Sequence, residues 1–140
     1  MIKPWRMKRL DQIWAVTVAL NRYPRFDACA ALSWANEMLD SDKVGMWRTE
    51  DVFLVAGLDE RFYAPDEKSA SIVFLCSARS DHRSAGQILA LARTAKAWAL
   101  ERGCRRLDFS AETLGVDFGP IARRLGRAHQ QIGYMIELGA

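Results

Sequence analysis

The sequence has few of the residues that would mark a metal site or a disulfide-stapled domain. Two of its 140 residues are histidine and three are cysteine. Neither His82 nor His129 has a partner at the spacing of metal ligands, so we expect no metal site. Cys29, Cys76 and Cys104 are odd in number and widely spaced. We therefore expect free thiols in a reducing compartment and no disulfide framework.

Long apolar runs and a strong charge of one sign are also missing. No apolar stretch is long enough for a signal peptide or a membrane span, so we expect a soluble, cytoplasmic protein. The net charge of +3 is well below that of a dedicated nucleic-acid-binding protein, and no nucleic-acid-binding motif is recognisable. Membranes and nucleic acids are therefore not expected as partners.

The chain does contain enough apolar material for one hydrophobic core, because half of its residues are hydrophobic. A length of 140 residues suits a single domain, which we assign to residues 1–140. No internal repeat or low-complexity tract divides it.

A strand–turn–helix–strand unit in Ser69–Ser110 organises the chain. The apolar block Ile72–Cys76 is typical of a strand covered on both faces. From Gly86 onward, apolar residues recur every three or four positions, which predicts a helix with one buried side, and Gly103 marks its end. Alternating apolar and polar residues around Leu107 predict the second strand of a β-α-β unit.

The flanking patterns predict the other elements. We expect a short strand within Ile2–Met7, and an antiparallel hairpin of Val44–Thr49 with Val52–Leu58. After the β-α-β unit we expect a short helix at Pro120–Leu125 and a closing strand at Gln131–Leu138.

Two helices are predicted between the first strand and the hairpin. The second should begin at Asp27 as its N-cap, because aspartate accepts from the free N–H groups of a first turn. The first should stop before Tyr23-Pro24. Its predicted buried side carries Leu10, Ile13, Trp14, Thr17 and Leu20. Together the elements predict an α/β fold.

The turn before the long helix is a candidate anion site. It consists of Arg83, Ser84, Ala85, Gly86, Gln87 and Ile88. The first N–H groups of a helix have no intrahelical acceptor and lie at the positive end of its dipole, so they attract phosphate. Gly86 would permit a close backbone approach or a positive φ, and Arg83 would add a charge. The alternative interpretation is an ordinary helix start with a turn glycine.

This turn resembles the acetyl-coenzyme A binding motif of the GNAT N-acetyltransferase superfamily. That motif reads Arg/Gln-x-x-Gly-x-Gly/Ala and lies between the fourth strand and the third helix of the family. Arg83 and Gly86 match it, whereas Ile88 stands where the family usually has a small residue. The order of elements is also similar, which implies a GNAT-like mixed central sheet flanked by helices.

The resemblance implies further ligand contacts. In the family the central strand parts from its neighbour at a bulge, and its backbone groups bind the pantetheine arm of the cofactor. Cys76, Ser77 and Ala78 occupy the matching positions. Acetyl-CoA is therefore the cofactor that the resemblance implies.

Transfer of an acetyl group to an amine also needs a base and an acid. Asp108 and Glu112 are the carboxylates near the expected cleft, and Glu112 is preferred because it follows the end of a strand. Many family members have a tyrosine acid where this chain has Ala122, and Tyr134 could replace it. The alternatives are an exposed structural carboxylate and a core tyrosine.

Two functions follow from the resemblance. The first is an N-acetyltransferase that uses acetyl-CoA and an amine-bearing acceptor of unknown identity. The alternative is a catalytically inactive GNAT-fold structural or interaction protein with protein partners in a larger assembly, for example a bacteriophage virion component. In that case its location would be the host cytoplasm or the virion. Ile88 and Ala122 favour the alternative.

Overall fold

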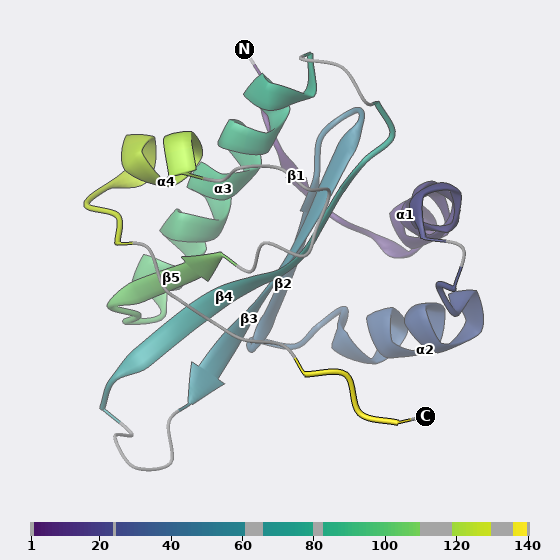
Figure 1. The fold of residues 1–140 in the computed structure, drawn as a ribbon, viewed down its shortest axis with the longest axis horizontal. Coiled ribbons are helices and arrows are strands. Elements are labelled where there is room, and N and C mark those ends of the chain that lie inside the picture. The colour runs from purple at the N-terminus through teal and green to yellow at the C-terminus, as the bar shows by residue number, and fades with distance from the viewer. Residues whose placement is uncertain are drawn as a thin grey trace.

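Five strands lie side by side in the order β1-β2-β3-β4-β5 in a computed structural model of the chain (Figure 1). The structure describes residues 2–23, 25–60, 66–79, 83–109, 119–129 and 136–139. The elements are β1 (Trp5–Arg6), α1 (Arg9–Arg22), α2 (Ala28–Met38), β2 (Val44–Arg48), β3 (Val52–Glu60), β4 (Lys68–Ser77), α3 (Ser84–Glu101), β5 (Arg106–Phe109) and α4 (Gly119–Leu125).

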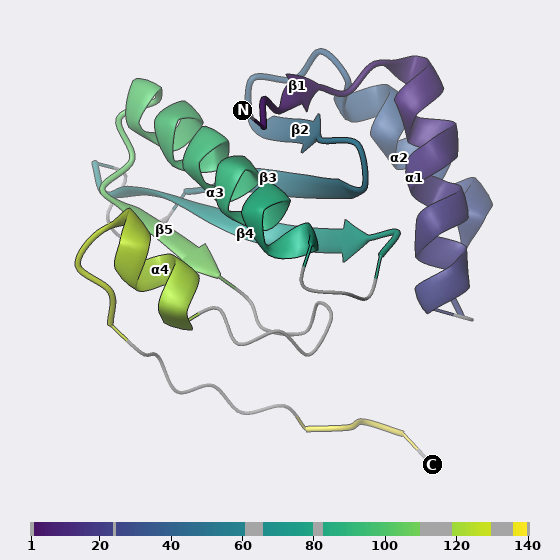
Figure 2. The same cartoon turned by 90° about the horizontal axis from the view of Figure 1, so that it is seen from above.

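The sheet is mixed and has helices on both faces. Strands β1 to β4 pair antiparallel, and β5 joins β4 in parallel after the crossover through α3. Helices α3 and α4 cover one face, and α1 and α2 cover the other (Figures 1 and 2). Because an apolar core forms on each side, the central strands are covered on both faces, as the block Ile72–Cys76 predicts for all of its residues except Val73, which is 52% exposed. The α/β fold class is confirmed.

The predicted buried side of α3 is confirmed. Its core-facing residues are buried, and they include Ile88, Leu91, Ala92, Ala95, Trp98 and Ala99. Gly103 follows the helix with φ +77°, and its N–H donates to the Leu100 carbonyl at 3.1 Å. The Cys104 N–H donates to Ala99 O at 3.0 Å, which completes a glycine-ended C-terminal cap.

The β2–β3 hairpin and the predicted N-cap of α2 are also confirmed. Arg48 pairs with Phe53 across the β2–β3 turn, and the Thr49 N–H donates to Val52 O at 2.8 Å. The Asp27 side chain accepts from the Ala30 N–H at 3.0 Å and caps α2.

The predicted buried side of α1 is wrong. Leu10 and Ile13 are 81% and 57% exposed, and Leu20 and Thr17 also face solvent. Only Trp14 of that set packs, partly buried, against the core. The core side instead carries Gln12, Ala15, Val18 and Ala19. Helix α1 has apolar residues on two sides, and the smaller side chains allow it to lie close to α2 and the sheet.

The predicted closing strand is wrong over its described part. Residues 136–139 belong to no strand, and Ile136 and Leu138 are 79% and 92% exposed. The rest of the prediction lies outside the described residues. Alternation specifies which side of a strand is apolar, but it does not supply a neighbour with which the backbone pairs.

Helix α4 confirms the short helix predicted after Pro120, and it is tied to α3. The Lys96 ammonium donates to the Leu125 carbonyl at the end of α4, where a cation is favourable. No helix in the described part of the chain is both long enough and apolar enough to cross a membrane.

Candidate functional site

Strand β4 carries a bulge at Val73. Phe74 pairs with Val55 and Ile72 pairs with Ala56, so Val73 is an extra residue opposite β3. Val73 is 52% exposed, whereas its neighbour Ile72 is buried and Phe74 is partly buried. A bulge bends the strand and increases its local twist, which separates the strand from a straight neighbour.

The parallel pairing of β4 ends at the same place. The last pair joins Ile72 to Phe109, whereas β4 continues to Ser77. Among the described strands, none pairs with Val73–Ser77 on the β5 side. One edge of β4 is therefore open over this stretch within the described structure.

The register shows which backbone groups face this edge. The Ala78 N–H donates to Asp51 O at 2.7 Å, so Ala78 faces β3. Because peptide groups alternate in direction along an antiparallel ladder, those of Leu75 and Ser77 point away from β3. The Ser77 carbonyl accepts from Arg22 Nε at 3.2 Å. The open edge therefore presents the N–H and C=O of Leu75 and the N–H of Ser77, whose carbonyl is bound by Arg22.

Helix α3 begins shortly after this edge. Arg83 is its N-cap residue, and its side chain is exposed. The N–H groups of Ala85 and Gly86 lie in the first turn, where an α-helix offers no intrahelical acceptor. Both residues are exposed, so the positive end of the helix dipole reaches the surface there.

Gly86 has a packing role besides any ligand contact. It lies within α3, and the described glycines with positive φ are Gly103 and Gly139. A Cβ atom added at Gly86 would lie 3.2 Å from Ile2 Cδ1. The N-terminal segment therefore packs closely where the glycine has no side chain.

The side chains of Gln87 and Ile88 are turned inward. Ile88 is 5% exposed and belongs to the core between α3 and the sheet. Gln87 Oε1 accepts from Thr49 Oγ1 at 2.5 Å and from the Asp51 N–H at 2.9 Å. Gln87 Nε2 donates to Asp51 Oδ2 at 2.9 Å. Any ligand contact of Gln87 and Ile88 must therefore come from their backbone.

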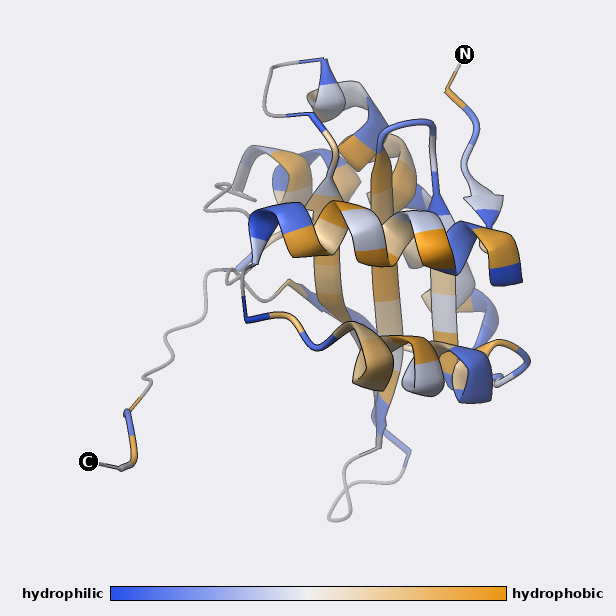
Figure 3. Cartoon of the chain, turned by 90° about the vertical axis from the view of Figure 1, so that its right-hand side faces the viewer, coloured by the Kyte–Doolittle hydropathy of each residue, from blue (hydrophilic) through white to orange (hydrophobic). Residues whose placement is uncertain are grey.

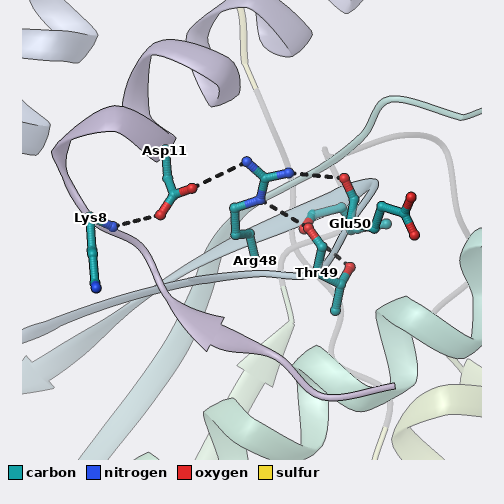
Figure 4. A network of polar contacts seen from close by, with 6 residues as sticks. Lys8, Asp11, Arg48, Thr49 and Glu50 are labelled. Atoms are coloured by element: carbon teal, nitrogen blue, oxygen red, sulfur yellow. Dashed lines mark hydrogen bonds and ion pairs between the residues drawn. The ribbon is translucent and has the colours of Figure 1, made fainter. Parts of the chain in front are cut away.

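A second set of contacts, centred on Arg48, holds the same β2–β3 turn from the side of α1 (Figure 4). We call it the Arg48 cluster. Arg48 donates from Nε to Thr49 O and from Nη2 to Glu50 O, each at 3.0 Å. Its Nη1 lies 3.3 Å from Asp11 Oδ1, and Asp11 Oδ2 accepts from the Lys8 backbone N–H at 2.9 Å. All three guanidinium nitrogens are therefore engaged.

Two tryptophans complete this cluster. The Arg48 guanidinium carbon lies 3.4 Å from the ring centre of Trp14 and 5.1 Å from that of Trp5. Such stacking stabilises a partly desolvated cation. Sequence reasoning missed the cluster, and its sole hint was the high tryptophan content. Together with Gln87, the cluster fixes the turn against the first turns of α1 and α3.

Cys76 is a core residue and has no catalytic thiolate. Its side chain is fully buried on the α1 side of the sheet, and burial raises the pKa of its thiol from 9.0 to about 11, with a smaller opposing effect of Arg22. At neutral pH the thiol is therefore protonated. A contact of Cys76 with a ligand would have to use its backbone.

The raised pKa of Cys76 predicts a loss of stability at alkaline pH. The unfolded thiol loses its proton near pH 9 and the folded thiol near pH 11, so the stabilisation is complete below pH 9 and is lost between these values. Wild type should lose on the order of 2 to 3 kcal/mol more unfolding free energy than Cys76→Ala over this range. Urea unfolding at several pH values measures this. Cys29→Ala, at an exposed thiol, should follow wild type, and a Cys76→Ala curve parallel to wild type would contradict the assignment.

The predicted catalytic residues Glu112 and Tyr134 lie outside the described residues. Asp108, the other carboxylate considered, is half-buried, and its Oδ1 lies 3.0 Å from Arg106 Nη2 in an ion pair. Within the described part of the chain, no group of three or more His, Cys, Asp or Glu residues could hold a metal ion.

Two surface hollows lie away from the open edge of β4. One of about 220 Å³ lies where β4 and β5 begin, beside Lys68 and Arg106. The other, of about 270 Å³, lies between β2 and α3 beside Trp47 and Trp98. The chemistry of the open edge and the α3 N-terminus makes that region the stronger candidate site, because peptide groups and a helix dipole converge there.

This chain is similar to known proteins by structure alone. No protein-family model and no curated protein matches the sequence. A predicted acetyltransferase from Clostridium acetobutylicum, solved with acetyl-CoA, is similar with a TM-score of 0.72 and 14% identity, over 99% of this chain and 96% of that one.

Two further solved structures match over nearly their whole length. A ribosomal-protein-alanine N-acetyltransferase from Brucella melitensis has a TM-score of 0.71 and 14% identity, over 99% of this chain and 100% of that one. A transcriptional regulator from Bacillus halodurans has a TM-score of 0.78 and 14% identity, with the same coverage. The mixed five-stranded sheet with helices on both faces is therefore the GNAT fold, the fold of N-acetyltransferases.

Proposed function

We propose that this protein is an N-acetyltransferase that binds acetyl-CoA at the open edge of β4. The observation that carries the proposal is the bulge at Val73, after which β4 continues to Ser77 without a described neighbour on the β5 side. The edge leads to the first turn of α3, so one ligand could contact both.

The donor set fits the chemical parts of this cofactor. The pantetheine arm carries amides, which suit the N–H and C=O of Leu75 and the N–H of Ser77. The diphosphate suits the first-turn N–H groups of Ala85 and Gly86 and the charge of Arg83. Of the other residues expected from the sequence, Cys76 lies within β4 and Ala78 directly follows it, and Ser84 is the first residue of α3. The side chains of Gln87 and Ile88 anchor α3 from within.

The cofactor would supply an acetyl group activated as a thioester. The chain holds the acceptor amine beside it, and this positioning contributes much of the rate. Within the proposal, Glu112 accepts the proton lost by the ammonium group before the amine attacks the carbonyl carbon. Tyr134 would donate a proton to the leaving sulfur and would take up the second proton that the acetylated nitrogen releases.

A catalytically inactive protein of the same fold is the second candidate. The packing of Gly86 against Ile2 and the hydrogen bonds of Gln87 give the motif a structural reason without any ligand. The protein would then act through its partners. A place in a bacteriophage virion rests on the sequence resemblance alone.

Calorimetry with acetyl-CoA distinguishes the two candidates. We expect saturable binding, and Arg83→Glu should weaken it by about 1 to 3 kcal/mol, because a charge-assisted contact to phosphate is replaced by repulsion. Arg93→Glu is the matched control, since Arg93 is also exposed on α3 but lies beyond the first turn. Acetyl transfer to a panel of amines is measured alongside.

The absence of heat and of any thermal shift at millimolar acetyl-CoA would reject the enzyme. Binding that Arg83→Glu and Arg93→Glu weaken equally would place the cofactor away from the first turn of α3. Tight binding without transfer to any amine would favour the inactive candidate.

A further inference from the structure

Helix α1 presents its larger apolar side chains to solvent. Leu10, Ile13 and Leu20 are 81%, 57% and 42% exposed. Figure 3 shows α1 at the outside of the molecule, with hydrophobic segments along it and no described element in front of it. Single exposed apolar residues are normal on protein surfaces, but a row of them on one helix indicates an interaction surface.

The spacing of these residues is that of a helix-packing seam. Leu10, Ile13, Thr17 and Leu20 follow one another at intervals of three, four and three residues, which keeps them in one line along α1. We call these four residues the outer seam. The opposite side of α1 is already used, because Ala15, Val18 and Ala19 pack against the core. The outer seam is therefore left for a second helix.

Positive charge flanks the outer seam at both ends. Lys8 and Arg9 precede it and Arg25 follows it, all three exposed. Arg22 is turned to the sheet, where its Nε donates to the Ser77 carbonyl. Asp11 is the one acidic residue between Lys8 and Arg25 in the sequence, and its carboxylate is engaged by Arg48. An occupant of the seam therefore meets apolar side chains in the middle and cations at each end.

We propose that the outer seam binds an amphipathic helix whose apolar stripe is flanked by acidic residues. A second copy of the chain fits less well, because antiparallel α1 helices would bring Arg9 of one copy against Arg25 of the other. Parallel helices would oppose identical ends, again cation against cation. An anionic lipid surface would match the charge, but a single line of side chains fits the groove of a helix better than a plane. The inference does not depend on the proposed acetyltransferase activity.

The probe is a designed helical peptide of about 20 residues with leucines at a and d positions and glutamates beside them. Calorimetry with the full chain should show binding that weakens between roughly 0.05 M and 0.5 M salt, because the flanking ion pairs are screened. Ile13→Glu should weaken it by about tenfold or more, since it places a charge in the apolar contact. The same peptide with lysines in place of glutamates should bind weakly or not at all.

Leu100→Glu is the matched control, because Leu100 is 61% exposed on α3 and lies outside the outer seam. Circular dichroism confirms that both variants are folded. The proposal is overturned if the acidic peptide fails to bind or if Leu100→Glu weakens binding as much as Ile13→Glu does. It is also overturned if sedimentation shows a dimer that Ile13→Glu dissociates. Binding to phosphatidylserine vesicles without binding to the peptide would assign the seam to a lipid surface and would reject the proposal.

Discussion

Leu91→Ala is expected to lower the free energy of unfolding by about 3 kcal/mol. Leu91 is completely buried between α3 and the sheet, in the core that also contains Leu54 and Leu75. Removing its three outer carbon atoms loses their burial and leaves a cavity, because a strand-and-helix interface relaxes only in part. Urea unfolding monitored by circular dichroism measures the change.

Leu100→Ala is the control on the same helix. Leu100 is 61% exposed, so the same chemical change removes little buried surface. The helix propensity of alanine acts equally at both positions, and the difference between the variants therefore reports the packing of α3. Equal stabilities of the two variants would show that α3 does not pack on the sheet through Leu91.

Gly45→Ala is expected to cost about 2 to 3 kcal/mol of unfolding free energy, at the upper end of overpacking effects. Gly45 precedes Trp47 by two residues on β2, so both lie on the same face of the sheet. A Cβ atom at Gly45 would lie 2.6 Å from Trp47 Cζ3 and 2.8 Å from Cζ2. The indole cannot move away easily, because it is 6% exposed and contacts the Trp98 ring edge-on at 5.5 Å between centroids.

Gly57→Ala is the matched control for this prediction. Gly57 lies on the neighbouring strand β3, opposite Val44, and a Cβ atom there would meet nothing within 4 Å. Alanine also loses less backbone entropy on folding than glycine does in a strand. Gly57→Ala should therefore be neutral or slightly stabilising, and a Gly45→Ala protein as stable as Gly57→Ala would contradict the position of the Trp47 ring.

The sequence was sufficient to predict those features that depend only on residues close to one another in the chain. Residues a few positions apart decide the buried side of α3, the Asp27 cap, the turn at Gly103 and the β2–β3 hairpin. The same reasoning failed for α1, because apolar residues occupy two of its sides and periodicity does not say which one meets the sheet.

The candidate site was predicted in part. A helix was correctly predicted after β4, but it begins at Ser84 and not at Gly86, so Ser84–Ile88 are helical where a turn was predicted. The contacts of this segment to a cofactor remain a prediction. The bulge at Val73 was not predicted, because it lies within a run of apolar residues that indicates a regular strand. The role of Gln87 was not predicted either, since its partners Thr49 and Asp51 are far away in the chain.

By itself, the sequence determined the α/β class, the order of the elements from β1 to α4 and the C-terminal ends of α1 and α3. These properties follow from backbone hydrogen bonding and side-chain spacing within a few residues. Only the tertiary structure decided that β4 leaves β5 after Ile72, that Arg48 is enclosed by Trp5 and Trp14, and that the larger apolar side of α1 faces outward. Each of these depends on which distant surfaces pack together, and packing is a property of shape and volume that no local pattern contains.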